Sequence, residues 1–247
     1  MKIYVINLPQ SNDRRNSINE QFQRFDSLDY ELFTAVDGNY MPDALQRKVN
    51  DEHRIIWRSR PLTRGEKGVY ASNYLLWKKC VELNEPIVIA EDDIKLNDNF
   101  QQSIELASSF IDQGFDYIRL AKNLTSAPTR NVPKNKHIEY ILDNQSGSTI
   151  CYAISPNGAK KLLDASDVWL CSVDNFVGEA YRTKLPCIAL TPHCCTISEF
   201  NSTIQKESKT RVHIMFKLTR ELYRFYRFLK LQLWNRLFQF KYLPPQK

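Results

Sequence analysis

Three consecutive acidic residues, Glu91, Asp92 and Asp93, directly follow the short apolar run at residues 87–90. Adjacent carboxylates repel one another, so holding them together requires solvent or a cation that takes up their charge. Carboxylate oxygens suit Mg²⁺ or Mn²⁺, and the end of a buried strand is where α/β sheets bind ligands. The acids alone do not distinguish a metal site from a solvated acidic turn.

The elements that position these acids follow from hydrophobic periodicity. Strand-like segments alternate with segments that have helical spacing or helix-start residues, which predicts an α/β fold with a parallel or mixed sheet and helices on both faces. The predicted strands are residues 2–8, 30–36, 87–90, 117–120, 148–155 and 186–190. The predicted helices are residues 14–25, 63–83, 98–111, 156–163 and 176–181. Loops are predicted at 40–61, with one short helix, and at 121–136.

Length and composition indicate an ordinary globular protein. The chain has 247 residues, of which 43% are hydrophobic and 25% charged, and it is long enough for one large α/β domain or two small ones. No apolar run is long enough to span a membrane, and the apolar N-terminal stretch is too short for a signal peptide. We therefore expect a cytoplasmic protein. The six cysteines include no C-x-x-C pair and are expected to be reduced and mostly buried.

The C-terminal tail has a different character. Residues 206–247 hold 11 Lys/Arg against 2 acidic residues, whereas the rest of the chain is mildly acidic. A helix over 211–240 would place basic residues on one face and apolar residues on another, which favours binding to an anionic membrane surface. The alternative is docking on the body or on another subunit. The basic residues are Lys217, Arg220, Arg224 and Arg227, and the apolar ones are Leu218, Leu222, Phe225, Leu229 and Leu233.

We therefore divide the chain into a domain at 1–205 and a basic amphipathic tail at 206–247. Removing the tail is expected to spare activity on a soluble substrate. A nucleic-acid partner is not expected, because the apolar content of the tail exceeds what binding to phosphates requires.

Several short motifs occur in a fixed order. They are IYVINL at 3–8, DRR at 13–15, AVDG at 35–38, TRGEKG at 63–68, EDD at 91–93, GS at 147–148, GAKKLL at 158–163 and VDNF at 173–176. In this order and spacing they resemble glycosyltransferase family 25, the lipooligosaccharide-type galactosyltransferases of Gram-negative bacteria, over about residues 1–200. The chain has Val69 and Asn73 where that family usually has Cys and His.

The resemblance implies a GT-A-type, Rossmann-like fold with a mixed central sheet, a UDP-sugar donor, a divalent cation (Mn²⁺ or Mg²⁺) and an inverting mechanism. Residues 91–93 stand where the family has its D-x-D-like motif. This implies Asp93 as the direct metal ligand, with Glu91 or Asp92 reaching the ribose or a water on the metal. One protein carboxylate completed by phosphates and waters is a normal shell for Mg²⁺.

The resemblance also implies residues that bind the nucleotide. Asn7, Leu8 and Arg14 are expected to border the uridine and phosphates, and Asp37 to contact the uracil or ribose. An arginine near the positive end of a helix is unfavourable, so an anionic ligand would explain Arg14. Glu66 has two interpretations, as a donor-binding carboxylate or as part of a T-x-x-E capping box with Thr63.

An inverting transfer needs a base that takes the proton of the attacking hydroxyl, and Asp174 is the candidate. The alternative for Asp174 is the N-cap of a helix that begins near Phe176. The expected function is transfer of a hexose, with galactose favoured, to a lipooligosaccharide sugar at the cytoplasmic face of the inner membrane. The alternatives are a UDP-glucose-dependent enzyme and a non-catalytic sugar-binding or assembly protein.

Overall fold

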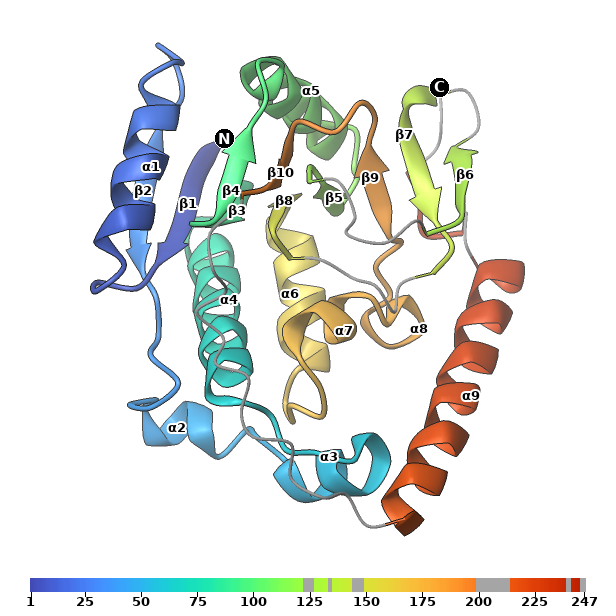
Figure 1. Ribbon diagram of the computed structural model, residues 1–247. Coiled ribbons are helices and arrows are strands. Elements are labelled where there is room, and N and C mark those ends of the chain that lie inside the picture. Colours follow the sequence, from blue (N-terminus) through green and yellow to red (C-terminus); the bar gives the residue numbers. More distant parts are fainter. Residues whose placement is uncertain (122–126, 133–134, 144–148, 199–213, 239–240, 245–247) are drawn as a thin grey trace.

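The computed structural model describes residues 1–121, 127–132, 135–143, 149–198, 214–238 and 241–244. An eight-stranded sheet with the order β2-β1-β3-β8-β5-β9-β7-β6 forms its centre. β1 is parallel to both its neighbours, whereas β8 is antiparallel to β3 and β5, so the sheet is mixed (Figure 1). The strands are β1 (Lys2–Asn7), β2 (Tyr30–Thr34), β3 (Ile87–Glu91), β5 (Tyr117–Arg119), β6 (Thr129–Val132), β7 (Asn135–Ile141), β8 (Cys151–Ile154) and β9 (Ile188–Leu190).

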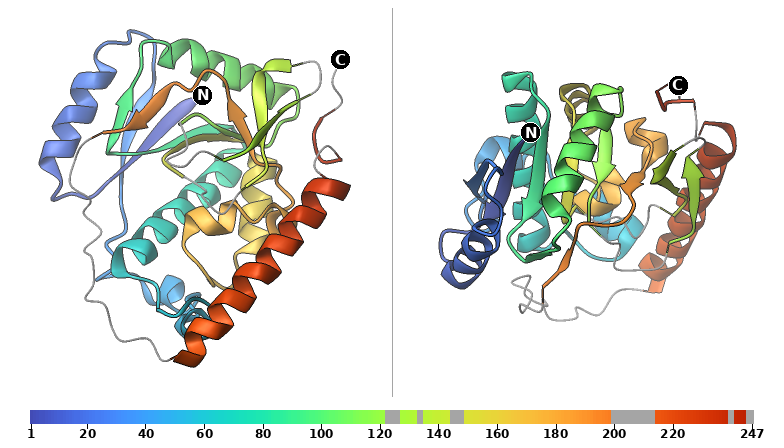
Figure 2. Two further views of the ribbon diagram at one scale, coloured as in Figure 1. Left: turned by 45° about the vertical axis from the view of Figure 1, so that its right-hand side comes forward. Right: turned by 90° about the horizontal axis from the view of Figure 1, so that it is seen from above.

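Helices cover both faces of this sheet (Figure 2). Successive side chains of a strand point to opposite faces, and β1 shows the consequence. Ile3 and Val5 pack in one core with α1 (Asn12–Phe22) and α5 (Phe100–Asp112). Tyr4 and Ile6 pack in a second core with α4 (Arg64–Leu83), α6 (Pro156–Ala165) and α7 (Val173–Val177). The fold class predicted from the sequence is confirmed.

Shorter elements complete the chain. A separate two-stranded sheet pairs β4 (Ile94–Leu96) with β10 (Cys195–Ile197). The remaining helices are α2 (Asp43–Gln46), α3 (Asp51–Arg58), α8 (Ala180–Thr183) and α9 (Ile214–Leu237). All six cysteines lie in the described residues, and each is a buried free thiol, as expected.

The sequence prediction was wrong at two predicted loops and one helix. Residues 40–61 form two helices, α2 and α3, and the segment 176–181 divides between α7 and α8. The predicted loop at 121–136 contains β6, whose residues Thr129–Asn131 are exposed at the edge of the sheet. A polar edge strand lacks the apolar alternation on which strand prediction depends.

Two glycines bring the loop after β2 against the start of α4. A Cβ on Gly68 would lie 2.5 Å from the carbonyl oxygen of Val36, and one on Gly38 would clash with the carbonyl oxygen of Arg64. Only glycine permits backbones to approach this closely. Gly68 therefore permits close packing of α4 against the loop after β2.

Helix α9 docks on the body along α3, α8 and the β6–β7 hairpin (Figure 1). Trp234 Nε1 donates to the Tyr140 hydroxyl at 2.9 Å, and Asn235 Nδ2 donates to the carbonyl oxygen of Leu142 at 2.7 Å. Docking on the body, one of the two alternatives for the tail, is therefore observed for one face of this helix. The domain boundary at 205/206 stays a prediction, because residues 199–213 lie outside the described chain.

Candidate functional site

A cavity of about 380 Å³ opens at the ends of β1, β2 and β3, next to the first turns of α1 and α4. Pockets of this size are typical of small-molecule sites. Its lining comes from four segments that the motifs mark, and includes Leu8, Arg14, Asp37 and all three acids at 91–93. The other lining residues are Ile6, Gln10, Ser11, Ala35, Val36, Gly38, Asn39, Thr63, Arg64, Gly65, Gly68, Val69 and Ser72.

Asp92 is the buried centre of a polar network beneath this cavity. Arg14 Nη1 donates to Asp92 Oδ1 at 2.8 Å, and Asn7 Nδ2 donates to Asp92 Oδ2 at 2.7 Å. The Arg14 side chain is only 7% exposed, so this is a charge-assisted contact out of water. The carboxylates of this chain therefore account for Arg14 at a helix start, where an anionic ligand was expected. Asn7 donates to Asp92 but is not among the residues that line the cavity.

Asp93 and Glu91 are carboxyl groups whose pKa values are raised in the folded protein. Arg14 Nη1 reaches Asp93 Oδ2 at 3.2 Å, yet burial raises the pKa of Asp93, with the Asp92 charge acting in the same direction. Burial raises the pKa of Glu91 well above its usual range, and the charges of Asp174, Asp93 and Asp92 add to this effect. A further cation next to these carboxyl groups would therefore be favourable.

Asp174 is linked to Glu91 through Thr149. The Asp174 Oδ1 atom accepts from the Thr149 backbone N–H at 2.9 Å and from its hydroxyl at 2.8 Å. The same hydroxyl lies 3.5 Å from Glu91 Oε1. Helix α7 begins at Val173 with Ser172 as N-cap, so the N-cap alternative for Asp174 was wrong.

The environment of Asp174 balances two effects. Burial raises the pKa of its carboxyl group, whereas the two hydrogen bonds from Thr149 and the positive charge of Arg119 lower it. Arg119 is fully buried at the end of β5. Sequence reasoning missed both Thr149 and Arg119, although a charged residue ending an apolar strand was a usable signal.

Comparison with known proteins shows the family of this chain. Residues 1–177 match the family model described as glycosyltransferase family 25 (LPS biosynthesis protein). The chain belongs to glycosyltransferase family 25. The resemblance inferred from the motif order is thereby confirmed.

Several curated relatives of this family 25 chain are animal proteins. A glycosyltransferase 25 family member from Aedes aegypti is 32% identical over 71% of this chain. Procollagen galactosyltransferase 2 from Homo sapiens is 30% identical over 73% of it. The chain spans about 30% of the length of these relatives. A solved glycosyltransferase involved in glycosylating the major capsid of PBCV-1 shares 10% identity with a TM-score of 0.41, over 91% of this chain and 98% of that chain.

Glu66, a predicted donor-binding residue of this family 25 chain, has a clear structural role. Its carboxylate accepts from the Thr63 backbone N–H at 2.8 Å while the Thr63 hydroxyl accepts from the Glu66 N–H at 3.1 Å, which confirms the capping box. Burial would raise its pKa, but hydrogen bonding from Arg60 and the charge of Arg54 hold the pKa of Glu66 below its usual range. Its donor-binding role stays a prediction.

The two departures from the family pattern lie in different surroundings. Val69 lines the cavity, whereas Asn73 is fully buried and accepts from the Tyr152 hydroxyl at 2.6 Å. Trp77 Nε1 donates to the same hydroxyl, and Trp77 belongs to the buried core. The motif residues Gly147 and Ser148 lie outside the described residues.

Proposed function

We propose that this chain transfers a hexose, with galactose favoured, from a UDP-sugar to the hydroxyl of an acceptor sugar with inversion at the anomeric carbon. One observation carries the proposal. Glu91, Asp92 and Asp93 line the cavity, and the carboxylate of Asp174, outside the lining, accepts from the same Thr149 hydroxyl that lies 3.5 Å from Glu91 Oε1. A donor in the cavity would therefore have its sugar next to a carboxylate that can accept a proton.

The donor set fits a divalent cation shared with the phosphates of the donor. Among the described residues, no three His, Cys, Asp or Glu side chains are grouped to hold a metal by themselves. Asp93 and Glu91 both line the cavity and would supply carboxylate oxygens, and burial raises the pKa of each. When bound, Mg²⁺ or Mn²⁺ stabilises the charge that develops on a departing diphosphate.

The side chains of the protein have separate roles in holding the site, binding the donor and accepting the proton. Arg14 holds Asp92 and one oxygen of Asp93, which fixes both carboxylates relative to the cavity. Leu8 and Asp37 line the part of the cavity where we place the uridine. Asp174, oriented by Thr149, takes the proton from the attacking hydroxyl, and a carboxyl pKa raised by burial makes it a stronger base.

The acceptor we propose is a sugar of lipooligosaccharide. The family description names LPS biosynthesis, whereas the similar animal proteins are named procollagen galactosyltransferases. Those names favour galactose as the donor sugar. A UDP-glucose-dependent enzyme remains the alternative within the same chemistry.

A screen of UDP-sugars tests this function. We expect UDP release from UDP-galactose in Mn²⁺ or Mg²⁺ with a lipooligosaccharide acceptor, and at least about 100-fold less in EDTA, because cation stabilisation of the diphosphate is worth several kcal/mol. Faster release from UDP-glucose would select the alternative donor. A folded protein with no turnover on any UDP-sugar would instead indicate the non-catalytic interpretation.

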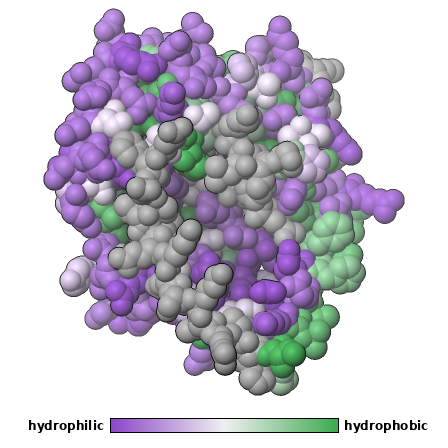
Figure 3. All heavy atoms as spheres, viewed as in Figure 1, coloured by the Kyte–Doolittle hydropathy of each residue, from purple (hydrophilic) through white to green (hydrophobic). Residues whose placement is uncertain are grey.

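We further propose that α9 places the enzyme on the cytoplasmic face of the inner membrane. Within the described part of the chain, no helix has both the length and the apolar character that spanning a bilayer requires. The face of α9 that points away from the body is nevertheless apolar and about half exposed or more (green at the lower right of Figure 3). Its residues include Leu218, Leu222, Phe225, Leu229 and Leu233, and exposed Lys217, Arg224, Lys230 and Arg236 accompany them. An apolar stripe with flanking cations fits an anionic lipid surface.

Charge introduced into this stripe should release the protein from lipid. Replacing Leu222, Phe225 and Leu229 together by glutamate removes three inserted side chains at about 1 kcal/mol each, so binding should fall about 100-fold. Sedimentation with phosphatidylglycerol vesicles measures the loss. Val81→Glu, on the exposed side of α4, is the control. Equal vesicle binding by the triple variant and the control would contradict a membrane role.

A further inference from the structure

The helix that carries Asp174 is too short to hold its own position. α7 has five residues, Val173–Val177, and a helix of this length is not stable without tertiary contacts. The location of Asp174 therefore depends on what holds α7 in place. Val173, Phe176 and Val177 are buried on one side, and the polar side of the helix needs a separate support.

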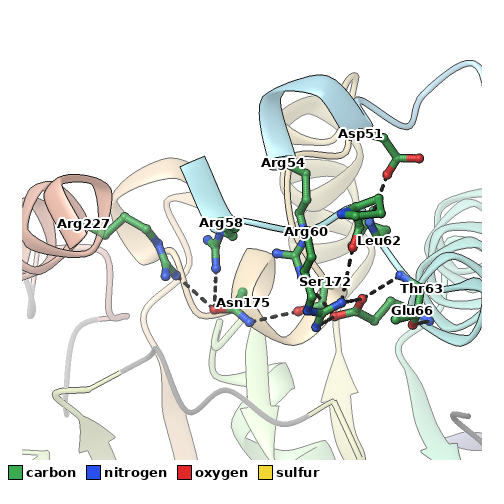
Figure 4. Close-up of polar contacts among 11 residues, drawn as sticks. Asp51, Arg54, Arg58, Arg60, Leu62, Thr63, Glu66, Ser172, Asn175 and Arg227 are labelled. Atoms are coloured by element: carbon green, nitrogen blue, oxygen red, sulfur yellow. Dashed lines mark hydrogen bonds and ion pairs between the residues drawn. The ribbon is translucent and has the colours of Figure 1, made fainter. Parts of the chain in front are cut away.

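Two arginines from distant parts of the chain provide that support (Figure 4). Arg58, the last residue of α3, and Arg227, in the middle of α9, both donate to Asn175 Oδ1, at 3.1 and 3.3 Å. Asn175 is the neighbour of Asp174 and donates from Nδ2 to Ser172 Oγ at 2.9 Å, which closes the first turn of α7.

The same two arginines also bind Glu179, directly after the C-terminal end of α7. Arg227 Nε donates to Glu179 Oε1 at 2.7 Å, and Arg58 Nη2 donates to the same oxygen at 3.2 Å. The side chains of Arg227 and Glu179 are only 5% and 4% exposed. Each guanidinium group therefore links the middle of α7, at Asn175, to Glu179, which lies just beyond the C-terminal end of the helix.

We propose that Arg58 and Arg227 are positioning residues for Asp174, so that α9 is part of the catalytic apparatus although it lies outside the region that matches the family model. The proposal rests on the proposed role of Asp174 as the base. It predicts that loss of the tail slows catalysis even on a soluble acceptor, contrary to the expectation drawn from the sequence.

Arg227 is not required merely to give the Glu179 carboxylate a positive partner. Glu179 is also approached by Arg182 Nη1 at 3.6 Å and by Arg58, so it keeps positive partners when Arg227 is lost. Arg227, like Arg58, presents a planar group that reaches Glu179 and Asn175 at once. A lysine ammonium, a single compact donor centre, does not reproduce such a two-point bridge.

Arg227→Lys therefore separates positioning from stability. The variant keeps a cation for Glu179 and should unfold at nearly the wild-type temperature. Because small displacements of a catalytic group are costly, kcat should fall about 10- to 100-fold while the KM for the UDP-sugar is unchanged. Asn175→Ala removes the shared acceptor and should lower kcat similarly. Arg24→Lys is the matched control, because Arg24 is an arginine outside both proposed sites, 44% exposed, and pairs with Asp98.

A double variant distinguishes this proposal from the proposed function. If Arg227 acts through the base, Arg227→Lys should not slow Asp174→Asn further. Multiplied losses, or a wild-type kcat for Arg227→Lys, would overturn the positioning role alone. A fully active Asp174→Asn would overturn the base assignment and this proposal with it.

Discussion

Replacing Asp174 by asparagine is expected to lower kcat by about 10²–10⁴-fold with little change in UDP-sugar binding, the loss typical of a general base. An amide oxygen can still accept the two hydrogen bonds from Thr149, so the side chain should keep its place. What it loses is the ability to take a proton. Steady-state kinetics with a saturating acceptor would give kcat, and calorimetry would give the affinity for UDP.

The control for this variant is Asp164→Asn, an exposed carboxylate on the neighbouring α6. It should have wild-type kcat and UDP affinity. Near-normal turnover by Asp174→Asn would show that another carboxylate is the base. Glu91 would then be tested next, because it shares the Thr149 hydroxyl.

The sequence predicted the order of the main strands and helices and the place of the acidic cluster, because both depend on local patterns. Periodicity and caps are local, as the confirmed Thr63–Glu66 capping box illustrates. The acids at 91–93 occupy the C-terminal end of a buried strand, so their location at that end of the sheet could also be predicted.

The residues that pair with the site residues could not be predicted from the sequence. Arg14 and Asp92 are 78 positions apart, and Arg227 and Glu179 are 48 apart. Nothing in the local pattern of either residue indicates the other. The sequence therefore suggested a ligand for Arg14, whereas the folded chain supplies Asp92, and it missed the hydroxyl of Thr149 that joins Glu91 to Asp174.

The tail illustrates the same limit. Helical spacing placed Arg227 on a basic face that was expected to meet lipid, but this side chain is buried against Glu179. Spacing specifies which residues share a face of a helix and not what that face contacts. In α9 the buried face has aromatic and charged groups matched to the body, and the apolar stripe on the opposite side is left exposed.

Asp92→Asn and Asp93→Asn are expected to have different defects. The first should lower the stability of the fold, and the second should affect donor binding. Asp92 is buried and ion-paired with Arg14, so Asp92→Asn leaves a buried guanidinium group with a weakened partner. Breaking a buried pair is strongly destabilising, by about 3–5 kcal/mol when a partner is lost. The side chain of Asp93 is 21% exposed and lines the cavity, so Asp93→Asn should fold normally.

Asp93→Asn is instead expected to abolish the dependence of donor binding on a divalent cation. Cation stabilisation of the diphosphate is worth several kcal/mol, which corresponds to about 100-fold or more in affinity. Calorimetric titration of UDP in Mn²⁺ should therefore show tight binding by the wild type and weak binding by the variant, and in EDTA the two should be alike. Asp98→Asn, a solvent-exposed carboxylate paired with Arg24, should bind as the wild type does. Wild-type binding of equal strength in Mn²⁺ and in EDTA would remove the cation from the mechanism, and the carboxyl groups at 91–93 would then serve to hold Arg14 and Asn7 in place.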